Sequence, residues 1–448
     1  MKKNIYESHS LTKLIFIFGV PSTLSLMIEM LTGIVDTAFA GNLPHMGGTA
    51  LSAMALISPL LGIFTALQTL FAMSTGIIIA RYMNQPSRLE SSYTTGVVMS
   101  ALVGLSTCAV CYFSLDGILS LLGASGEVFV LAKQYLKIQL FSNIFSGLGY
   151  TFTCCIRAFG FPKIEVAIIS FSVVANILCN FVFSFVFSMG MKGLALGTLV
   201  SEVLCALLSA IFLMKKGLWV SKIPLPLNDF LKNVGELFKI GVSQTAIQVL
   251  GGFTGFAINS RLLSLGSMGH VAAWSVVQRI YTFVLMPIVG LTQGVQSVIS
   301  YFSGKGEMEK IPKISKLTIA LCTGYGFIAL GFVLKFAKNI VLLFGGNPEI
   351  TGVTNVILPI VFLGFPLIGI LYTHMTLLQV TGHEVASVLL ILSRQVFFLL
   401  PLIYLLPPLF DLMNFPLNGV MTLFFCMPVA DFLSVIFSVG VSKFIDKG

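Results

Sequence analysis

Two carboxylates lie within the first long apolar segment of the chain, where a charged side chain is costly. Glu29 and Asp36 are seven residues apart, close to two turns of an α-helix, so both side chains lie on one face. An ionisable residue inside a membrane span costs about 2.5–3.5 kcal/mol on insertion scales. The basic residue of this segment, Lys13, is about six turns away from Asp36. The pattern favours a carboxylate that binds a cation or a proton and faces a water-filled cavity. An interhelical salt bridge or a protonated, hydrogen-bonded acid is the structural alternative.

Neutral oxygen donors on two later segments could complete a site around Asp36. Asn176 and Asn180 are one helical turn apart on the fifth apolar segment, and Thr198 follows the glycine-rich start of the sixth. One carboxylate, two amide oxygens and a hydroxyl suit Na⁺, or a proton on Asp36 that the amides hold, and the chain has no His and Cys cluster that suggests a transition metal. Spacing alone does not bring the four residues together, so their convergence is a prediction.

The composition shows which kind of protein carries these residues. Of the 448 residues, 56% are hydrophobic and 10% are charged, against about 25% charged in soluble domains, and the mean hydropathy is +0.98. No water-soluble fold of this length could bury so much apolar surface, so the chain is an integral membrane protein. A soluble enzyme, a nucleic-acid-binding protein and a disordered chain are excluded.

Twelve segments of about 20 or more mostly apolar residues are long enough to cross a membrane as helices. None shows the alternation with period two that is typical of outer-membrane barrel strands, so the expected fold is all-α. The first six spans are predicted at 14–41, 50–80, 94–115, 130–153, 164–188 and 193–214. The second six are predicted at 236–260, 271–303, 315–334, 352–377, 386–408 and 415–442.

The basic residues predict the orientation of these helices. Eighteen of the 26 Lys and Arg residues fall on the side of the N-terminus, against four on the other side, or six with Lys133 and Lys137. The four on the other side are Lys192, Arg261, Lys335 and Lys338. Because cytoplasmic loops carry the excess of Lys and Arg, both termini are expected in the cytoplasm and the protein in the cell (inner) membrane.

The two sets of six spans are related by an internal repeat of 222 residues. The recurring blocks are Gly19-Val20 with Gly241-Val242, Thr32-Gly33 with Thr254-Gly255, Leu122-Gly123 and Glu127 with Phe344-Gly345 and Glu349, and Gly160 with Gly382. Equivalent helices therefore run in the same direction, which predicts two parallel, pseudo-symmetric six-helix lobes around a central cavity. The expected domains are an N-lobe at 1–214, a cytoplasmic linker at 215–235 and a C-lobe at 236–448. Within the linker, a short amphipathic helix is expected, capped by Asn228 and Asp229.

Several motifs resemble those of one transporter family. They are Pro21 with the run Val35-Asp36-Thr37-Ala38-Phe39-Ala40-Gly41, Arg157-Ala158-Phe159-Gly160, the LLGA and LFGG turns at 121–124 and 343–346, and Gly294-Val295-Gln296 with Tyr301 and Gly304. With the duplication and the twelve spans, they resemble the multidrug and toxic compound extrusion (MATE) family over essentially the whole chain. The resemblance implies cation-coupled export of amphipathic, often cationic compounds by alternating access. It also implies an N-lobe cation site at Asp36, Asn176, Asn180 and Thr198.

Other residues are expected to contact substrate or to let the first helix change shape. The expected substrate contacts are Glu29, Met30, Gln278, Gln293 and His374. For Glu29 the alternatives are a second protonation site and a paired structural acid, and for Met30 the alternative is ordinary bundle packing. For His374 the alternatives are proton transfer and an interhelical hydrogen bond. Pro21 removes one helix hydrogen bond and is an expected hinge, with a plain bend as the alternative. Structural ion pairs near helix ends are expected for Glu202, Arg394 and Asp431.

The leading hypothesis is a multidrug antiporter driven by H⁺ or Na⁺, with no cofactor and with small amphipathic or cationic molecules as substrates. A monomer in the lipid bilayer, without nucleic-acid partners, is expected. The alternative is a related flippase for lipid-linked or other amphipathic lipids, although such proteins usually have more spans and a basic cavity. An enzyme is not expected, because the chain has no HExxH motif, no DDxxD-like acid pair and no nucleophile elbow.

Overall fold

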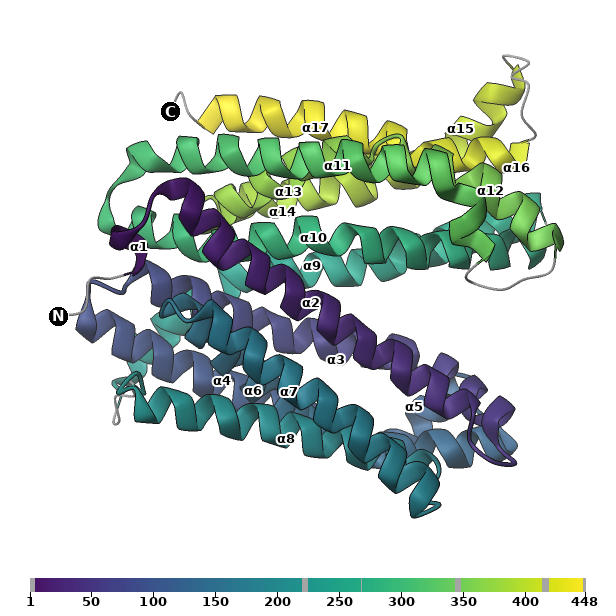
Figure 1. Ribbon diagram of the computed structural model, residues 1–448, viewed down its shortest axis with the longest axis horizontal. Helices are drawn as coiled ribbons and strands as arrows, with labels where there is room; N and C mark the ends of the chain where they lie inside the picture. Colours follow the sequence, from purple (N-terminus) through teal and green to yellow (C-terminus); the bar gives the residue numbers. More distant parts are fainter. Residues whose placement is uncertain (1–4, 220–224, 267, 343–347, 413–418, 446–448) are drawn as a thin grey trace. The chain divides into compact units, whose positions relative to one another are not determined.

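The computed structural model describes residues 5–219, 225–266, 268–342, 348–412 and 419–445, and nearly all of them are helical (Figure 1). The helices of the first half are α1 (Ile5–Ser8), α2 (Leu11–Gly41), α3 (Gly47–Arg81), α4 (Pro86–Phe113), α5 (Leu115–Leu121), α6 (Gly126–Ala158), α7 (Pro162–Phe181), η1 (Val182–Val186) and α8 (Met191–Lys215). Those of the second half are α9 (Leu227–Leu265), α10 (Met268–Lys305), η2 (Met308–Lys310), α11 (Ile311–Leu342), α12 (Pro348–Phe362), α13 (Phe365–Val380), α14 (Glu384–Leu392), η3 (Ser393–Leu399), α15 (Leu400–Leu412), α16 (Gly419–Thr422), η4 (Leu423–Phe425) and α17 (Cys426–Ile445).

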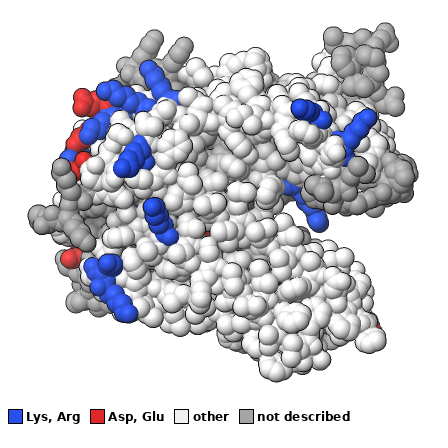
Figure 2. Space-filling view, in the orientation of Figure 1, with Lys and Arg blue, Asp and Glu red and all other residues white. Residues whose placement is uncertain are grey.

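Each of the twelve predicted spans coincides with a long helix or with consecutive helices. Nine helices of the described chain, and one bent pair, are long and apolar enough to cross a membrane by themselves. The helices α6 and α9, with 33 and 39 residues, account for the remaining two. On the face shown in Figure 2, the charged side chains are few and leave broad uncharged surfaces between them. The predicted twelve-span helical membrane fold is confirmed.

The tenth span is broken into two helices that differ in direction by 48°. The break falls between α12 and α13, where Gly364 precedes Pro366 in the first turn of α13. Proline has no backbone N–H to continue the helix of the preceding turn, so the chain starts a new helix there. At Gly364 an added Cβ would lie 2.7 Å from Asp431 Oδ2, so the glycine lets α17 pack closely against the break.

The contacts between residues divide the chain into two compact units, and each unit has its own apolar core. Unit 1 comprises residues 1–245 and 297–307, and unit 2 comprises residues 246–296 and 308–448. In unit 1, α6 packs against α3, α4, α7 and α8, while α2 packs against α3 and α7. In unit 2, α13 packs against α11, α14 and α17, and the π-helix η3 packs against α15 and α17.

Equivalent parts of the internal repeat adopt the same local structure. Gly160 follows the last turn of α6 and Gly382 follows the last turn of α13, and both have a φ of 92°, in the left-handed region that favours glycine. A π-helical stretch also occurs in the fifth span of each half, as η1 and as η3. The LFGG turn at 343–346 lies outside the described residues, as does the side chain of Glu349.

The prediction of a separate short helix in the linker is wrong. Asn228 and Asp229 lie in the first turn of α9, which continues without a break to Leu265. No proline follows them to stop the helix, and Glu236, two turns on, accepts hydrogen bonds from Arg81 and Tyr82. These contacts fix the start of α9 to the end of α3, so the capping residues begin the seventh span itself. Residues 220–224 of the linker lie outside the described part of the chain.

The one-turn helix α1 ties other helices together within unit 1. Tyr6 donates a hydrogen bond to the carbonyl of Ala158, at the end of α6, over 2.6 Å. Its ring stacks on that of Tyr301 near the end of α10, with 4.3 Å between the ring centroids. The next residue, Glu7, accepts hydrogen bonds from Tyr301 at 2.9 Å and from Lys305 at 2.6 Å. The short helix α1 therefore contacts both the end of α6 and the end of α10 and connects them.

The contact between Glu7 and Lys305 is expected to weaken in acid. The hydrogen bonds from Lys305 and Tyr301 hold the pKa of Glu7 below its ordinary value. The stabilisation is therefore fully present above about pH 4–5 and is lost as the pH falls through the lowered pKa. Hydrogen exchange of α1, corrected for intrinsic rates, is expected to show protection at about pH 7 that is lost near about pH 3. In a Glu7→Gln variant the protection is expected to be low at both values. Equal acid sensitivity in the two proteins would contradict this role of Glu7.

Candidate functional site

Asp36 lies in the interior of unit 1, next to the two asparagines of the fifth span. Its Oδ1 accepts a hydrogen bond of 2.5 Å from Nδ2 of Asn180, and the same nitrogen donates to Oδ1 of Asn176 at 3.1 Å. Asn176 Nδ2 in turn lies 3.4 Å from the hydroxyl of Thr198 on α8. The four residues are between 0% and 8% exposed. The structure thus brings the predicted set together from α2, α7 and α8.

The amide of Asn180 is the centre of this cluster. Its nitrogen is shared between two oxygen acceptors, whereas its own Oδ1 is buried without a hydrogen-bond partner among the described residues. Rotation of the amide by half a turn would place an oxygen beside the oxygens of Asp36 and Asn176. Three such oxygens repel one another unless a cation or a proton lies between them. The cluster can therefore hold H⁺ or Na⁺ after one side-chain rotation.

Two residues that the sequence analysis did not single out border the cluster. The hydroxyl of Ser201 lies 3.4 Å from Asn176 Nδ2, and the side chains of Tyr135 and Thr198 are hydrogen-bonded. Ser201 is three residues after Thr198 and so lies on the same helix face, which is a signal that spacing could have supplied. Tyr135 belongs to a different span, α6, and no pattern within one helix indicates it.

Close packing of α8 against α7 positions the cluster. An added Cβ at Gly197 would overlap the amide oxygen of Asn180, and one at Gly193 would lie 2.6 Å from the backbone nitrogen of Ser184. Ser184 belongs to η1, the π-helical stretch that widens the turn after Asn180. The two glycines are one helical turn apart, and they let the backbones of the fifth and sixth spans approach beside the asparagines.

Gly197→Val is expected to destabilise the protein by about 1–3 kcal/mol, because its side chain would enter the space of the Asn180 amide and overpack the contact between α7 and α8. The midpoint of thermal unfolding of detergent-purified protein measures the effect. The matched control is Gly62→Val on α3, where nothing lies within 4 Å of an added Cβ. This control is expected to change the midpoint far less, and equal losses at the two positions would contradict the packing argument.

A buried ion pair joins the end of α6 to the start of α7. Arg157 Nη1 lies 3.0 Å from Glu165 Oε1, and the two side chains are 7% and 2% exposed. The same nitrogen contacts the hydroxyl of Ser22 at 3.5 Å. Ser22 follows Pro21 directly, and α2 continues through both residues without a break. The predicted hinge therefore lies beside a fixed charge pair, and its movement stays a prediction.

Glu29 is exposed although it lies midway along α2, and the neighbouring Met30 is half-buried. The charged groups near Glu29 are Glu165, Glu202 and Arg157. The prediction of an ion pair for Glu202 is wrong. Within the described chain Glu202 has no ion pair with a Lys or Arg, because the group that its carboxylate meets is the neutral hydroxyl of Ser146. The first helix thus carries one acid whose side chain is exposed and one whose side chain is buried, two turns apart.

A polar network that the sequence analysis did not anticipate crosses three helices of unit 1. Gln68 of α3 donates from Nε2 to the side-chain oxygen of Asn143 on α6, and its Oε1 accepts from the hydroxyl of Ser146 at 3.3 Å. Ser146 also contacts Glu202 of α8. These are single polar residues on separate spans, so no spacing within one helix could have indicated that they meet.

The predicted substrate contacts of unit 2 lie in different environments. Gln278 is exposed and lies beside Gly255 of α9, and Gln293 is half-buried. His374 Nδ1 lies 3.1 Å from the hydroxyl of Ser438 on α17, so the ring takes part in an interhelical hydrogen bond. Contact of these three residues with substrate stays a prediction.

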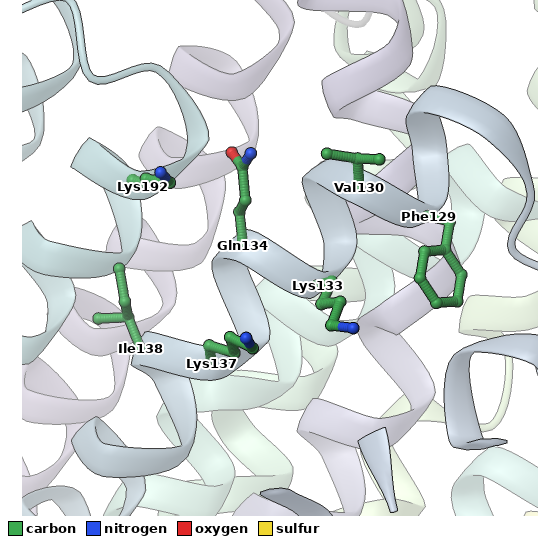
Figure 3. Close-up of a pocket in the computed structure, with 7 residues that line it drawn as sticks. All are labelled: Phe129, Val130, Lys133, Gln134, Lys137, Ile138 and Lys192. Atoms are coloured by element: carbon green, nitrogen blue, oxygen red, sulfur yellow. The ribbon is translucent and has the colours of Figure 1, made fainter. Parts of the chain in front are cut away.

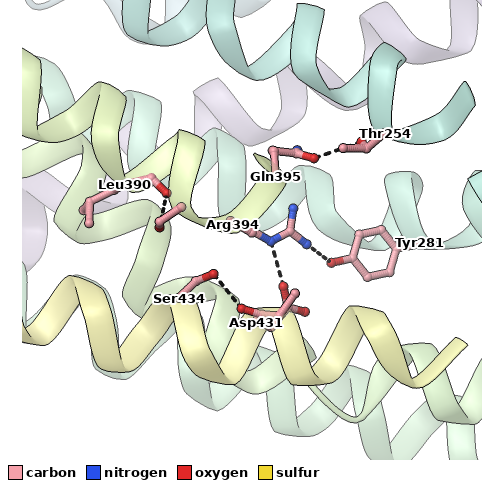
Figure 4. A network of polar contacts seen from close by, with 9 residues as sticks. Thr254, Tyr281, Leu390, Arg394, Gln395, Asp431 and Ser434 are labelled. Atoms are coloured by element: carbon pink, nitrogen blue, oxygen red, sulfur yellow. Dashed lines mark hydrogen bonds and ion pairs between the residues drawn. The ribbon is translucent and has the colours of Figure 1, made fainter. Parts of the chain in front are cut away.

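The core of unit 2 contains an ion pair between Arg394 and Asp431, two residues for which structural pairs are expected from the sequence, without their partners being indicated. Arg394 Nε lies 2.7 Å from Asp431 Oδ1, and its Nη2 donates to the hydroxyl of Tyr281 at 3.3 Å (Figure 4). In the same network, the hydroxyl of Thr254 donates to Oε1 of Gln395 at 2.9 Å. Asp431 is 1% exposed, so this pair is closed away from solvent and is structural.

The second half has no equivalent of the Asp36 cluster. The repeat positions of Asp36, Asn176 and Asn180, 222 residues on, are Ile258, Phe398 and Leu402. Within the described residues, no group of three or more His, Cys, Asp and Glu side chains is placed to hold a metal ion. In the register of the repeat, the carboxylate and the two amides of the Asp36 cluster therefore have apolar counterparts in the second half.

Comparison with known families places the chain among membrane transporters. The MatE family model matches residues 21–182 and 245–405, one stretch in each half and together most of the chain. The chain belongs to the MATE family. This confirms the family that the motifs around Asp36, Gly160 and Gln296 resemble, and it makes the protein a multi-pass membrane transporter.

Relatives and solved structures cover nearly all of the MATE chain. It is 30% identical over 421 residues to multidrug export protein MepA of Staphylococcus aureus strain N315, which spans 91% of this chain and 90% of the relative. It is 28% identical over 416 residues to MepA of Staphylococcus haemolyticus, over 91% and 89% of the two chains. An outward-facing multidrug resistance MATE family transporter has the same fold, with a TM-score of 0.90 at 19% identity over 100% and 99% of the chains. A MOP superfamily transporter from Pyrococcus furiosus matches with a TM-score of 0.88 at 18% identity, over 99% of this chain and 98% of that chain. The predicted two-lobe architecture is thereby confirmed.

Proposed function

We propose that this protein is a multidrug antiporter that exports amphipathic, often cationic compounds by alternating access in exchange for H⁺ or Na⁺. The observation that carries the proposal is the carboxylate of Asp36, which is 7% exposed and accepts its hydrogen bond from the neutral amide of Asn180. The relatives named as multidrug export proteins support the substrate class.

Asp36 is proposed to take up and release the coupling ion. A buried carboxylate without a basic partner is costly in its charged form, and no Lys or Arg of the described chain pairs with Asp36. Bound H⁺ or Na⁺ therefore stabilises the carboxylate of Asp36 most when the carboxylate is buried away from water. Asn176, Asn180 and Thr198 are proposed to supply the remaining oxygens. Pro21 is proposed to let α2 bend when the charge of Asp36 changes.

Drug and ion need not meet in this mechanism, because each needs only to favour one of two opposite states of the transporter. A pH step of one unit supplies about 1.4 kcal/mol per proton, which corresponds to about tenfold accumulation of a substrate exchanged one for one. The exposed carboxylate of Glu29 is proposed to attract cationic compounds. The other proposed substrate contacts are Met30, Gln278, Gln293 and His374.

The proposed arrangement in the cell membrane is a monomer with both termini in the cytoplasm. It has an N-lobe at 1–214, a linker at 215–235 and a C-lobe at 236–448. The excess of Lys and Arg on the side of the N-terminus supports this orientation.

Ethidium efflux from proteoliposomes under separately imposed H⁺ and Na⁺ gradients tests the proposal. One of the two gradients is expected to drive efflux, and an ionophore that collapses that gradient is expected to stop it. Efflux under neither gradient, with protein that is folded by size-exclusion chromatography, would contradict coupled drug export. The flippase alternative would then be measured directly, as movement of a fluorescent lipid between leaflets of the same liposomes.

A further inference from the structure

A pocket of about 470 Å³ lies between α6 and the start of α8 in unit 1. Its lining residues, here called the lysine pocket, are Phe129, Val130, Lys133, Gln134, Lys137, Ile138 and Lys192. Six of them recur at helical spacing along α6, while Ala132, Tyr135, Leu136 and Leu140 of the same helix are buried. The pocket therefore opens to the surroundings of unit 1 and is separate from the Asp36 cluster.

The three lysines of this pocket lie on the side of the protein that has few basic residues. Lys192 is one of only four basic residues that the sequence places on the side opposite the N-terminus, and Lys133 and Lys137 raise that number to six. Half of this small set therefore converges on one pocket, from α6 and from the start of α8. The orientation of the helices does not require basic residues at this end of the molecule, because the excess of Lys and Arg lies on the side of the N-terminus.

Within the part of the chain that the structure describes, two of the three positive charges form no ion pair with an acid. Lys133 Nζ lies 2.5 Å from Asp116 Oδ1 and 5.7 Å from the centre of the Phe129 ring. Lys137 and Lys192 are exposed, and no acidic residue is among those that line the pocket. Figure 3 shows Lys192 of α8 across from Gln134 of α6, with Lys133 directed toward Phe129. The pocket thus combines an excess of positive charge with apolar walls.

The position of the pocket along the helices matches the boundary between headgroups and hydrocarbon. The 33 residues of α6 span about 50 Å, which exceeds a hydrocarbon core of about 30 Å by roughly 10 Å at each end. Lys133 and Lys137 lie about 10 and 16 Å from the start of this helix, and Lys192 is the second residue of α8. Long lysine side chains at this depth can reach the headgroup layer.

We infer that the lysine pocket binds the phosphate headgroup of an anionic phospholipid, with Lys137 and Lys192 contacting the phosphate. Lysine is a point-charge donor suited to phosphate, and Gln134 adds a neutral hydrogen-bonding group. Phe129, Val130 and Ile138 offer apolar contacts to the start of an acyl chain. An anionic lipid is favoured over a zwitterionic one because the pocket carries uncompensated positive charge and no acid that would pair with an ammonium group. In the orientation proposed above, this lipid belongs to the outer leaflet.

Lipid binding to detergent-purified protein tests the inference without depending on transport. Native mass spectrometry counts bound dioleoylphosphatidylglycerol and dioleoylphosphatidylcholine in mixed micelles, and the wild type is expected to prefer the former. Replacing both free lysines, Lys137→Gln with Lys192→Gln, is expected to weaken phosphatidylglycerol binding about fivefold per lysine, or about 25-fold in total. The matched control removes two other exposed lysines of the same side, Lys335→Gln with Lys338→Gln, and is expected to change it less than about twofold.

Three results would overturn the inference. They are equal binding of the two lipids by the wild type, equal losses in the two double variants, and displacement of phosphatidylglycerol by an equal concentration of inorganic phosphate, which would indicate a site for free anions. If the first double variant does not fold, the single variants Lys137→Gln and Lys192→Gln are measured instead. Each single variant is expected to bind phosphatidylglycerol about fivefold more weakly than the wild type. An unchanged affinity in both would also overturn the inference.

Discussion

Asp36→Asn is expected to abolish ion-driven efflux while the protein still folds and reaches the membrane. The substituted side chain has nearly the same shape, and its oxygen can still accept the hydrogen bond that Asn180 donates to Asp36 at 2.5 Å. It cannot bind and release a proton, and it offers no negative charge to Na⁺. In proteoliposomes, a gradient of one pH unit is worth about tenfold accumulation per proton, and the variant is expected to show no accumulation.

The matched control for this prediction is Asp116→Asn. It removes an acid of the same type, but one that is 65% exposed and pairs with Lys133 at the surface. Wild-type efflux is expected from the control, which separates the effect of the Asp36 charge from a general effect of losing an acid. Normal efflux by the Asp36 variant would show that the ion is exchanged elsewhere, and Glu29 and Glu202 are the other acids of that lobe to examine next.

The fold could be predicted from the sequence because lipid leaves a chain few alternatives. A span must satisfy its backbone hydrogen bonds internally, so twelve apolar segments without period-two alternation can only be helices. The repeat could be detected because equivalent turns need the same backbone, as Gly160 and Gly382 show with a φ of 92° in both. The short linker helix is wrongly predicted from Asn228 and Asp229, because capping residues mark where a helix starts and carry no information about its length.

The members of the candidate site could be predicted for a similar physical reason. Polar residues are costly in an apolar span, so Asp36, Asn176 and Asn180 stand out against their surroundings without any knowledge of their contacts. What the sequence could not supply is the pairing between spans, such as that of Gln68 with Asn143. It also could not supply the close approach of Gly197 to Asn180, which follows from the packing of two helices and not from the pattern of either.

Asp431→Leu is expected to lower the free energy of unfolding by about 3–5 kcal/mol, because it leaves the guanidinium of Arg394 buried without its counter-ion. The pair is well closed, since the two side chains are 12% and 1% exposed for Arg394 and Asp431. Tyr281 remains as a neutral acceptor for Arg394 Nη2, and a neutral partner does not replace the lost charge. Unfolding of the purified protein by titration with a denaturing detergent measures the change.

Combining Asp431→Leu with Arg394→Met is expected to recover most of this loss, because replacing both charges of a buried pair by apolar groups of similar volume is often neutral. The surface counterpart, Asp116→Leu, breaks an ion pair whose carboxylate is 65% exposed and is expected to cost less than about 1 kcal/mol. If Asp431→Leu cost no more than this surface variant, the charge of Arg394 would have to be satisfied by water or by another group. If instead the double variant were as unstable as Asp431→Leu alone, the geometry of the pair, and not the uncompensated charge, would be what holds α17 against the π-helical part of the eleventh span.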